Sequence, residues 1–303
     1  MIHQLQEVNA FWPWFFPFWA GLFGACVGSF LNVCIYRIPK NESVVHPRSH
    51  CGCGQLIAWY DNIPVLSWFV LRGRARCCGR PFSFRYPAIE LLTAGLFVAC
   101  FLLFPPGKAL AGAILCTIVI CAHFIDHDHM IIPDVFTIGG AAAGLLLSLA
   151  IPSLHGEAHD YFVVASVRSG LDALLGLFVG SALVLWIGLF AEALLKKEAM
   201  GFGDVKYLGA LGAFVGWHGA VFGFFGGAVL GCVWFVVSYI WQKATGHQGP
   251  GNLPAATPEG EPTELGLGVH VPFGPMLGLG ALIYFFWAHR WVDPYFLELK
   301  SLF

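Results

Sequence analysis

The chain has 303 residues, of which 57% are hydrophobic and 11% are charged. Because soluble domains carry roughly 25% charged residues, a soluble fold of this length could not bury so much apolar surface. The formal net charge is −2, so no nucleic-acid partner is expected. The composition predicts an all-α polytopic membrane protein whose surroundings are a lipid bilayer.

Apolar stretches predict about eight transmembrane helices, since roughly 17–25 apolar residues cross a hydrocarbon core. The N-terminus has no basic region and no cleavage motif, so the first stretch is expected to be a retained span. A break at Gly216-Trp217-His218-Gly219 separates the short sixth span from the seventh. The predicted spans are residues 11–35, 87–104, 109–125, 135–152, 171–195, 205–217, 219–241 and 272–289.

The polar segment from Tyr36 to Tyr86 follows the first span and carries eight of the sixteen Lys and Arg residues. The positive-inside rule therefore predicts a cytoplasmic loop domain between the first two spans. Eight spans then put both chain ends outside, and the loops of residues 126–134 and 196–204 inside. Residues 242–270 would also be inside and read as a flexible connector.

Two aspartates lie at the edges of apolar stretches: Asp126 in His123–Asp134, and Asp204 in Gly201–Lys206. Ionisable groups at membrane depth usually have a function. When two carboxylates share one proton, the ionised one can act as a general base and the protonated one as a general acid. Gly201 and Gly203 are predicted to allow a close backbone approach or a positive φ. Lys206 is a nearby cation that could hold Asp204 ionised.

Further motifs accompany the aspartates: Gly28-Ser29-Phe30-Leu31-Asn32-Val33, Tyr36-Arg37-Ile38-Pro39, Asn62-Ile63-Pro64-Val65-Leu66-Ser67-Trp68, Leu71-Arg72-Gly73-Arg74, Arg85-Tyr86-Pro87 and Glu90-Leu91-Leu92-Thr93. With these motifs the chain resembles the bacterial type IV prepilin peptidases, intramembrane aspartic proteases that are also N-methyltransferases. The resemblance covers about residues 21–241.

This resemblance implies that Asp126 and Asp204 are the catalytic aspartates, supported by Pro133 and Asp134 of the same motif. Asp134 is predicted to be structural, as the N-cap of the fourth span. The implied enzyme removes the short basic leader from prepilins or pseudopilins and then methylates the new N-terminal amine with S-adenosylmethionine. The implied location is the bacterial inner membrane, with the active site at the cytoplasmic face.

The predicted spans and loops, together with this resemblance, divide the chain into five parts. They are an N-terminal periplasmic or interfacial segment (1–20), a methyltransferase-associated N-terminal domain (21–105), an aspartic peptidase membrane domain (106–241), a flexible cytoplasmic loop (242–270) and a last span with a C-terminal tail (271–303).

The loop cysteines depart from the family pattern of two C-x-x-C pairs, which resembles a structural zinc site. Here the pairs are Cys51-Gly52-Cys53 and Cys77-Cys78, and Ala75 stands where the third family cysteine would be. Reduced cytoplasmic thiols could still bind zinc in a distorted site, with His46 or His50 as a substitute ligand. The alternative is a protease whose methyltransferase activity is impaired or lost.

The methyl-donor site is the least specified part of the sequence, because no nucleotide-binding fingerprint is found. Glu90 is a candidate contributor to methyl transfer, and the alternative is a carboxylate that pairs with Arg85.

Other functions compete for the ionisable residues. The aspartates and histidines could relay ions in a transporter or proton channel. His123, His127 and His129 could form a metal site with the neighbouring carboxylates. Asp128 competes with Asp126 for the catalytic role. A transporter would require charged groups in the middle of several facing spans, whereas here they cluster at one boundary. A metal site would not explain the Gly-Phe-Gly-Asp motif.

Overall fold

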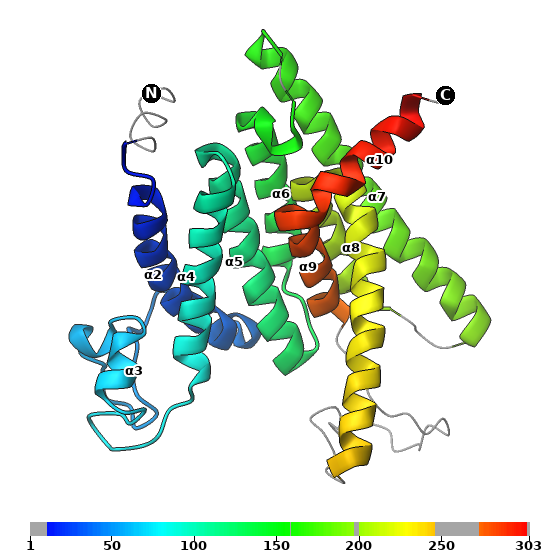
Figure 1. Ribbon diagram of the computed structural model, residues 1–303. Coiled ribbons are helices and arrows are strands. Elements are labelled where there is room, and N and C mark those ends of the chain that lie inside the picture. Colours follow the sequence, from blue (N-terminus) through cyan, green and yellow to red (C-terminus); the bar gives the residue numbers. More distant parts are fainter. Residues whose placement is uncertain (1–10, 158, 197–199, 246–272, 302–303) are drawn as a thin grey trace.

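The computed structural model describes residues 11–157, 159–196, 200–245 and 273–301, which form a helical protein (Figure 1). Within these ranges two isolated β-bridges occur and no extended strand. The predicted all-α class is therefore confirmed. Residues 1–10 of the predicted N-terminal segment and residues 246–270 of the predicted connector lie outside the described residues.

The helices begin and end where the local sequence favours it. Pro106 occupies the first turn of α5, where its missing N–H is not needed. Met130 ends α5 and Lys196 ends α7, each in the left-handed conformation that closes many helices. The long helices are α2 (Phe15–Arg37), α4 (Arg85–Leu103), α5 (Pro106–His129), α6 (Asp134–Ala150), α7 (Phe162–Leu195) and α8 (Phe202–Thr245). The remaining elements are α3 (Leu66–Val70), 3-10 turns at Ile38–Lys40, Trp59–Asn62 and Pro152–His155, α9 (Phe273–Ile283), a π-helical turn (Tyr284–Ala288) and α10 (His289–Ser301).

Five helices in the described part, α2, α4, α5, α7 and α8, are long and apolar enough to cross a membrane. The predicted count of eight spans is not confirmed. The helix α6 is apolar but has only 17 residues, and the predicted spans six and seven both fall within α8. The last predicted span corresponds to the 11-residue α9 and the π-helical turn.

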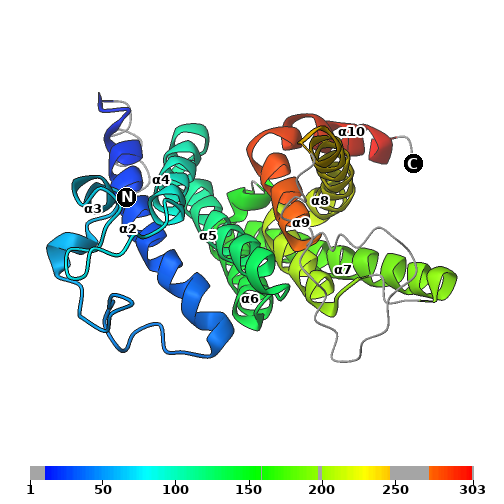
Figure 2. The ribbon, with the colours of Figure 1, turned by 90° about the horizontal axis from the view of Figure 1, so that it is seen from below.

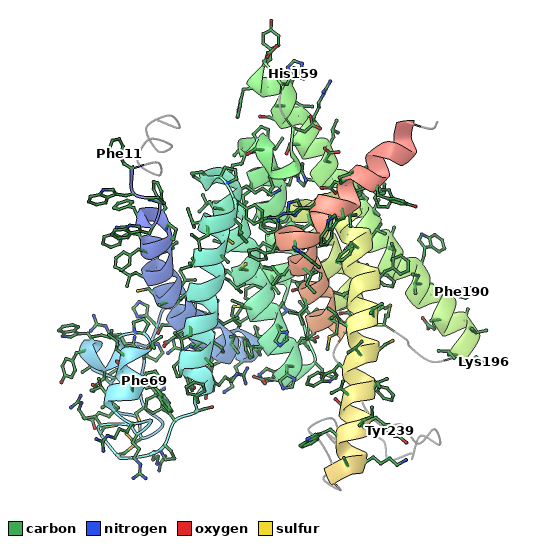
Figure 3. The ribbon with its side chains drawn as sticks, in the orientation of Figure 1. Phe11, Phe69, His159, Phe190, Lys196 and Tyr239 are labelled. Atoms are coloured by element: carbon green, nitrogen blue, oxygen red, sulfur yellow. The ribbon has the colours of Figure 1, made fainter. Side chains whose placement is uncertain are left out.

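The predicted break before span seven is confirmed at Gly216, which has a φ of 70° and a ψ of 179° inside α8. These angles are not helical, and the positive φ suits a glycine because it has no Cβ. Beyond the break α8 returns to the end of the molecule at which α7 stops, as the labels of Tyr239 and Lys196 show in Figure 3.

The centre of the bundle is α5, whose Leu115, Cys116 and Cys121 have no exposed surface. Seen from below, α2, α3 and α4 lie on one side of α5, and α7, α8 and α9 lie on the other (Figure 2). The backbones of α7 and α8 are in contact at Gly176 and Gly212. A methyl group on Gly176 would come within 2.1 Å of the carbonyl oxygen of Gly212, so no larger residue fits there. Small residues allow such contacts between membrane helices.

Candidate active site

Asp126 lies in the last turn of α5 and is only 7% exposed. The backbone N–H of Gly274, at the start of α9, donates a hydrogen bond to its carboxylate. A methyl group on Gly274 would come within 2.7 Å of Oδ2 of Asp126 and within 2.7 Å of Cδ1 of Ile132. The glycine therefore lets the start of α9 approach this carboxylate, a contact that sequence analysis missed.

Asp204 lies in the first turn of α8, and its backbone N–H donates to the carbonyl oxygen of Gly201 at 3.1 Å. Its carboxylate is close enough to Asp126 for the two charges to interact. Asp126 and Asp204 are far apart in the sequence, but the C-terminal end of α5 and the N-terminal end of α8 bring them near each other. The charged groups share a half-buried environment in which two neighbouring carboxylates can hold one proton between them.

The glycines beside Asp204 do not have the predicted role. Neither Gly201 nor Gly203 has a positive φ. A methyl group on Gly203 would make an ordinary contact of 3.8 Å with Ile132, so this position does not need a glycine for space. The close backbone approach occurs instead at Gly274.

Lys206 does not pair with Asp204 as predicted. Its ammonium group forms an ion pair with Asp134, because it projects toward the first turn of α6. Asp134 is the first residue of α6 and Pro133 precedes it, so Asp134 is not the N-cap. The carbonyl oxygen of Pro133 accepts hydrogen bonds from Phe136 and Thr137, and this turn holds α6 beside α8.

The helix α5 continues through Asp126 to His129 and ends at Met130. Asp128 forms an ion pair with Arg85 of α4, with an N–O distance of 2.6 Å. The Arg85 guanidinium also lies over the ring of Phe124. His123, His127 and His129 are not among the side chains that the described structure gathers closely enough to share a metal ion.

Glu90 is buried in α4 and does not pair with Arg85, so the alternative reading of this residue is wrong. Its Oε2 accepts a hydrogen bond of 2.6 Å from the backbone N–H of Val65. Val65 has a φ of 64°, a strained conformation for a β-branched residue. Glu90 thus holds the loop before α3 against α4.

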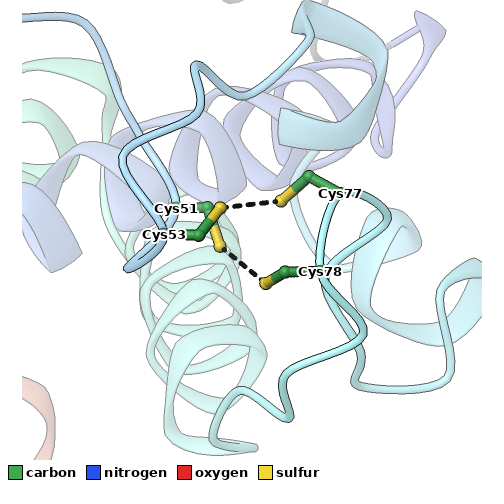
Figure 4. Close-up of side chains that lie close together, drawn as sticks. All are labelled: Cys51, Cys53, Cys77 and Cys78. Carbon is green, nitrogen blue, oxygen red and sulfur yellow. Dashed lines mark hydrogen bonds between the residues drawn. The ribbon is translucent and has the colours of Figure 1, made fainter.

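The four loop cysteines converge in space, although they lie on two separate turns (Figure 4). The Sγ atoms of Cys51 and Cys78 are 3.5 Å apart, as are those of Cys53 and Cys77. All four sulfur atoms lie within 4.8 Å of one another. A tetrahedral zinc site with Zn–S bonds of about 2.3 Å needs sulfur atoms roughly 3.8 Å apart, so this donor set fits zinc. Neither predicted histidine substitute belongs to the group.

The thiols also influence one another's ionisation. The backbone N–H of Cys53 and the thiols of Cys77 and Cys78 lower the pKa of Cys51 to about 7. The thiols of Cys51 and Cys53 raise the pKa of Cys77 to about 12. Cys51 therefore loses its proton more readily than Cys77.

Comparisons with known proteins identify the family of this chain. Residues 22–104 match the bacterial peptidase A24 N-terminal domain, and residues 113–236 match the type IV leader peptidase family. A Myxococcus xanthus prepilin leader peptidase/N-methyltransferase is 38% identical over 75% of this chain and 63% of its own length. An Escherichia coli type 4 prepilin-like proteins leader peptide-processing enzyme is 39% identical over 70% of this chain and 82% of its own. No solved structure matched the chain significantly.

A Xanthomonas campestris prepilin leader peptidase/N-methyltransferase is 33% identical over 92% of this chain and 94% of its own length. The chain therefore belongs to the type IV leader peptidase family. This result confirms the resemblance inferred from the sequence motifs, and the matched segments contain both aspartates and all four loop cysteines.

Proposed function

We propose that Asp126 and Asp204 form the aspartyl dyad with which this protein removes the short basic leader from type IV prepilin-like precursors. By family membership the protein is a prepilin leader peptidase and N-methyltransferase. The observation that carries the dyad is that the two carboxylates, from the C-terminal end of α5 and the N-terminal end of α8, lie close enough for their charges to interact. Neither carboxylate has an Arg or Lys ion-pair partner in the described residues.

The chemistry needs one proton shared by the pair. The ionised carboxylate takes a proton from water while the water oxygen attacks the scissile carbonyl carbon. The protonated carboxylate gives its proton to the carbonyl oxygen. When the tetrahedral intermediate breaks down, the leaving amine takes up a proton and the dyad again holds one. The Gly274 N–H keeps the Asp126 carboxylate in place during these steps.

The substrate would reach this site from the membrane. Large apolar side chains such as Phe178 and Trp186 of α7 and Val229 of α8 are exposed, as expected for lipid-facing helices. The Arg-rich loop lies at the same end of the molecule as the C-terminal end of α5 (Figure 1). The positive-inside rule then supports a dyad at the cytoplasmic face of the inner membrane. A prepilin or pseudopilin leader would be cut there.

The methylation half of the reaction is supported by the relatives' names, and by resemblance S-adenosylmethionine supplies the methyl group. The Glu90 carboxylate is buried and engaged with Val65, so it does not fit a contact with the methyl donor. We assign Glu90 to holding the loop before α3. Zinc on Cys51, Cys53, Cys77 and Cys78 would be structural, since four thiolates leave no open coordination position.

Cleavage of a model prepilin in membranes tests the dyad. Asp126→Asn and Asp204→Asn should each abolish cleavage, because an amide can neither accept nor donate the required proton. Asp128→Asn is the matched control, being a nearby carboxylate on the same helix that pairs with Arg85. It should retain most activity. Cleavage by either dyad variant at the wild-type rate would overturn the assignment.

The mass of the product's N-terminus separates the two proposed forms of the enzyme. A product heavier by one methyl group supports the bifunctional enzyme, whereas an unmethylated product supports the protease-only alternative.

A further inference from the structure

Tyr207 is a completely buried residue that the proposed mechanism does not use. It has no exposed surface, and its hydroxyl has no hydrogen-bond partner among the described residues. Buried hydroxyls in folded proteins nearly always have a partner, so an orphaned one calls for an explanation such as a bound water or a catalytic role. A phenylalanine would fill the same volume without this defect.

Tyr207 lies where the three helices that form the site, α5, α8 and α9, pack together. It follows Asp204 by three residues in α8, and residues at this spacing share a helix face. Its hydroxyl would be 2.8 Å from a methyl group on Gly278, which lies one turn along α9 from Gly274. A methyl group there would also contact Val119, two turns before Asp126 in α5. Tyr207 thus lies beneath the aspartates, on the side that faces the bundle interior.

The Tyr207 hydroxyl and the Asp126 carboxylate both lie against α9. A methyl group on Gly274 would come within 2.7 Å of the Asp126 carboxylate, and one on Gly278, a helical turn of about 5.4 Å further along, would come within 2.8 Å of the Tyr207 hydroxyl. The hydroxyl makes no direct hydrogen bond to a described residue, so a contact with the carboxylate requires a bridging water. The charges of both Asp126 and Asp204 interact with Tyr207. The other titratable group that interacts with it is Cys121 of α5.

We propose that Tyr207 is a positioning residue of the peptidase, whose hydroxyl donates a hydrogen bond through one bound water to the ionised carboxylate of the dyad. The proposal rests on the proposed dyad. A neutral phenol is a suitable donor, because it stays protonated at neutral pH. The bridge fixes the orientation of the ionised carboxylate and stabilises its charge inside the helix bundle.

Tyr207→Phe tests the proposal by removing a single oxygen atom. The rate constant kcat for leader cleavage should fall by about 10- to 100-fold, the size of a lost hydrogen bond to a charged group, with little change in KM. The acid limb of the pH–rate profile should move to higher pH, because the ionised carboxylate loses a donor. Thermal stability should change little, since phenylalanine fills the same buried volume and only one water-mediated hydrogen bond is lost.

Ser169→Ala is the matched control. Ser169 lies in α7, has no exposed surface, and also has a hydroxyl without a partner among the described residues. This variant should keep the wild-type kcat and pH profile.

The outcomes separate the two proposals. Wild-type kcat and an unchanged pH profile in Tyr207→Phe overturn the role of Tyr207. A loss of activity that parallels a loss of thermal stability, or that Ser169→Ala shares, also overturns it, because a packing role would then suffice. Cleavage by Asp126→Asn or Asp204→Asn overturns the dyad itself, whatever Tyr207→Phe does.

Discussion

Asp126 and Asp204 sit on helices that pack closely against their neighbours, whereas the four cysteines lie on two largely exposed turns, each closed by an isolated β-bridge. In the first region the position of each carboxylate depends on helices packed to contact distance. In the second, little apolar burial holds the thiols, so a bound metal would itself stabilise the turns. Damage to packing should therefore harm the aspartate region most, and loss of ligands should harm the cysteine region most.

Among changes that leave the two aspartates themselves in place, Gly274→Ala has the largest expected effect. Its methyl group would come within 2.7 Å of Asp126 and Ile132, so the carboxylate or α9 must move. Displacing a catalytic group by about 1 Å can cost roughly 100-fold in rate, and we expect a fall in leader cleavage of that size. Gly139→Ala is the control, because a methyl group there meets no atom within 4 Å. Equal activity in both variants would contradict tight packing at the dyad.

Zinc binding to the cysteine region should depend steeply on pH. The lowered pKa of Cys51, about 7, means that this thiol is increasingly protonated as the pH falls through 7. Cys77, with a pKa raised to about 12, keeps its proton until a metal displaces it. Zinc affinity should therefore rise at least about tenfold per pH unit between roughly pH 6 and 8, more steeply below 7. Competition with a chelator of known affinity measures this slope, and a flat profile would exclude thiolate ligands.

The Arg85–Asp128 ion pair links α4, on the cysteine side, to α5, which carries Asp126. Its side chains are 36% and 28% exposed, so solvent weakens the pair. A double-mutant cycle of Arg85→Ala and Asp128→Asn on unfolding should give a coupling of about 0.2–1 kcal/mol. The same cycle on the Arg76–Asp61 pair of the loop, whose side chains are 56% and 11% exposed, provides a comparison and should give a coupling in the same range. A coupling well above about 1 kcal/mol in the Arg85–Asp128 pair would contradict its weakening by solvent.

The smallest expected effect is that of Cys53→Ser on leader cleavage. This change should remove bound zinc, as metal analysis of the purified protein would show, but alter the cleavage rate by less than about threefold. Cys232→Ser, an exposed cysteine of α8, is the control for thiol loss. Cleavage as low as in Asp204→Asn would show that the two regions are not independent.

The sequence predicted several features for reasons that are local. The hydrophobic stretches predicted helices, and the glycine-rich break before Trp217 predicted the change of direction at Gly216, because both depend on neighbouring residues. The two aspartate motifs predicted a pair, because each places a carboxylate at the end of an apolar segment. The four cysteines could be named, although their spacing did not show that all four sulfur atoms would meet.

Partners between distant segments were predicted poorly. Lys206 was expected to stabilise the charge of Asp204 and instead forms an ion pair with Asp134. Arg85 was a possible partner of Glu90 and instead pairs with Asp128. These choices depend on how each helix is rotated about its axis, which the spacing of residues along one segment does not specify. The buried Tyr207 could have been noticed as a polar aromatic residue one turn after Asp204.

By itself the sequence determined the helical membrane class, the two aspartates and the family, because composition, apolar length and short motifs are properties of contiguous residues. Only the tertiary structure decided that Gly274 supports Asp126, that Glu90 holds Val65, and that Tyr207 lies beneath the dyad. Those contacts arise from close packing between segments that are far apart in the chain. In such packing, one added methyl group is enough to push two side chains out of contact.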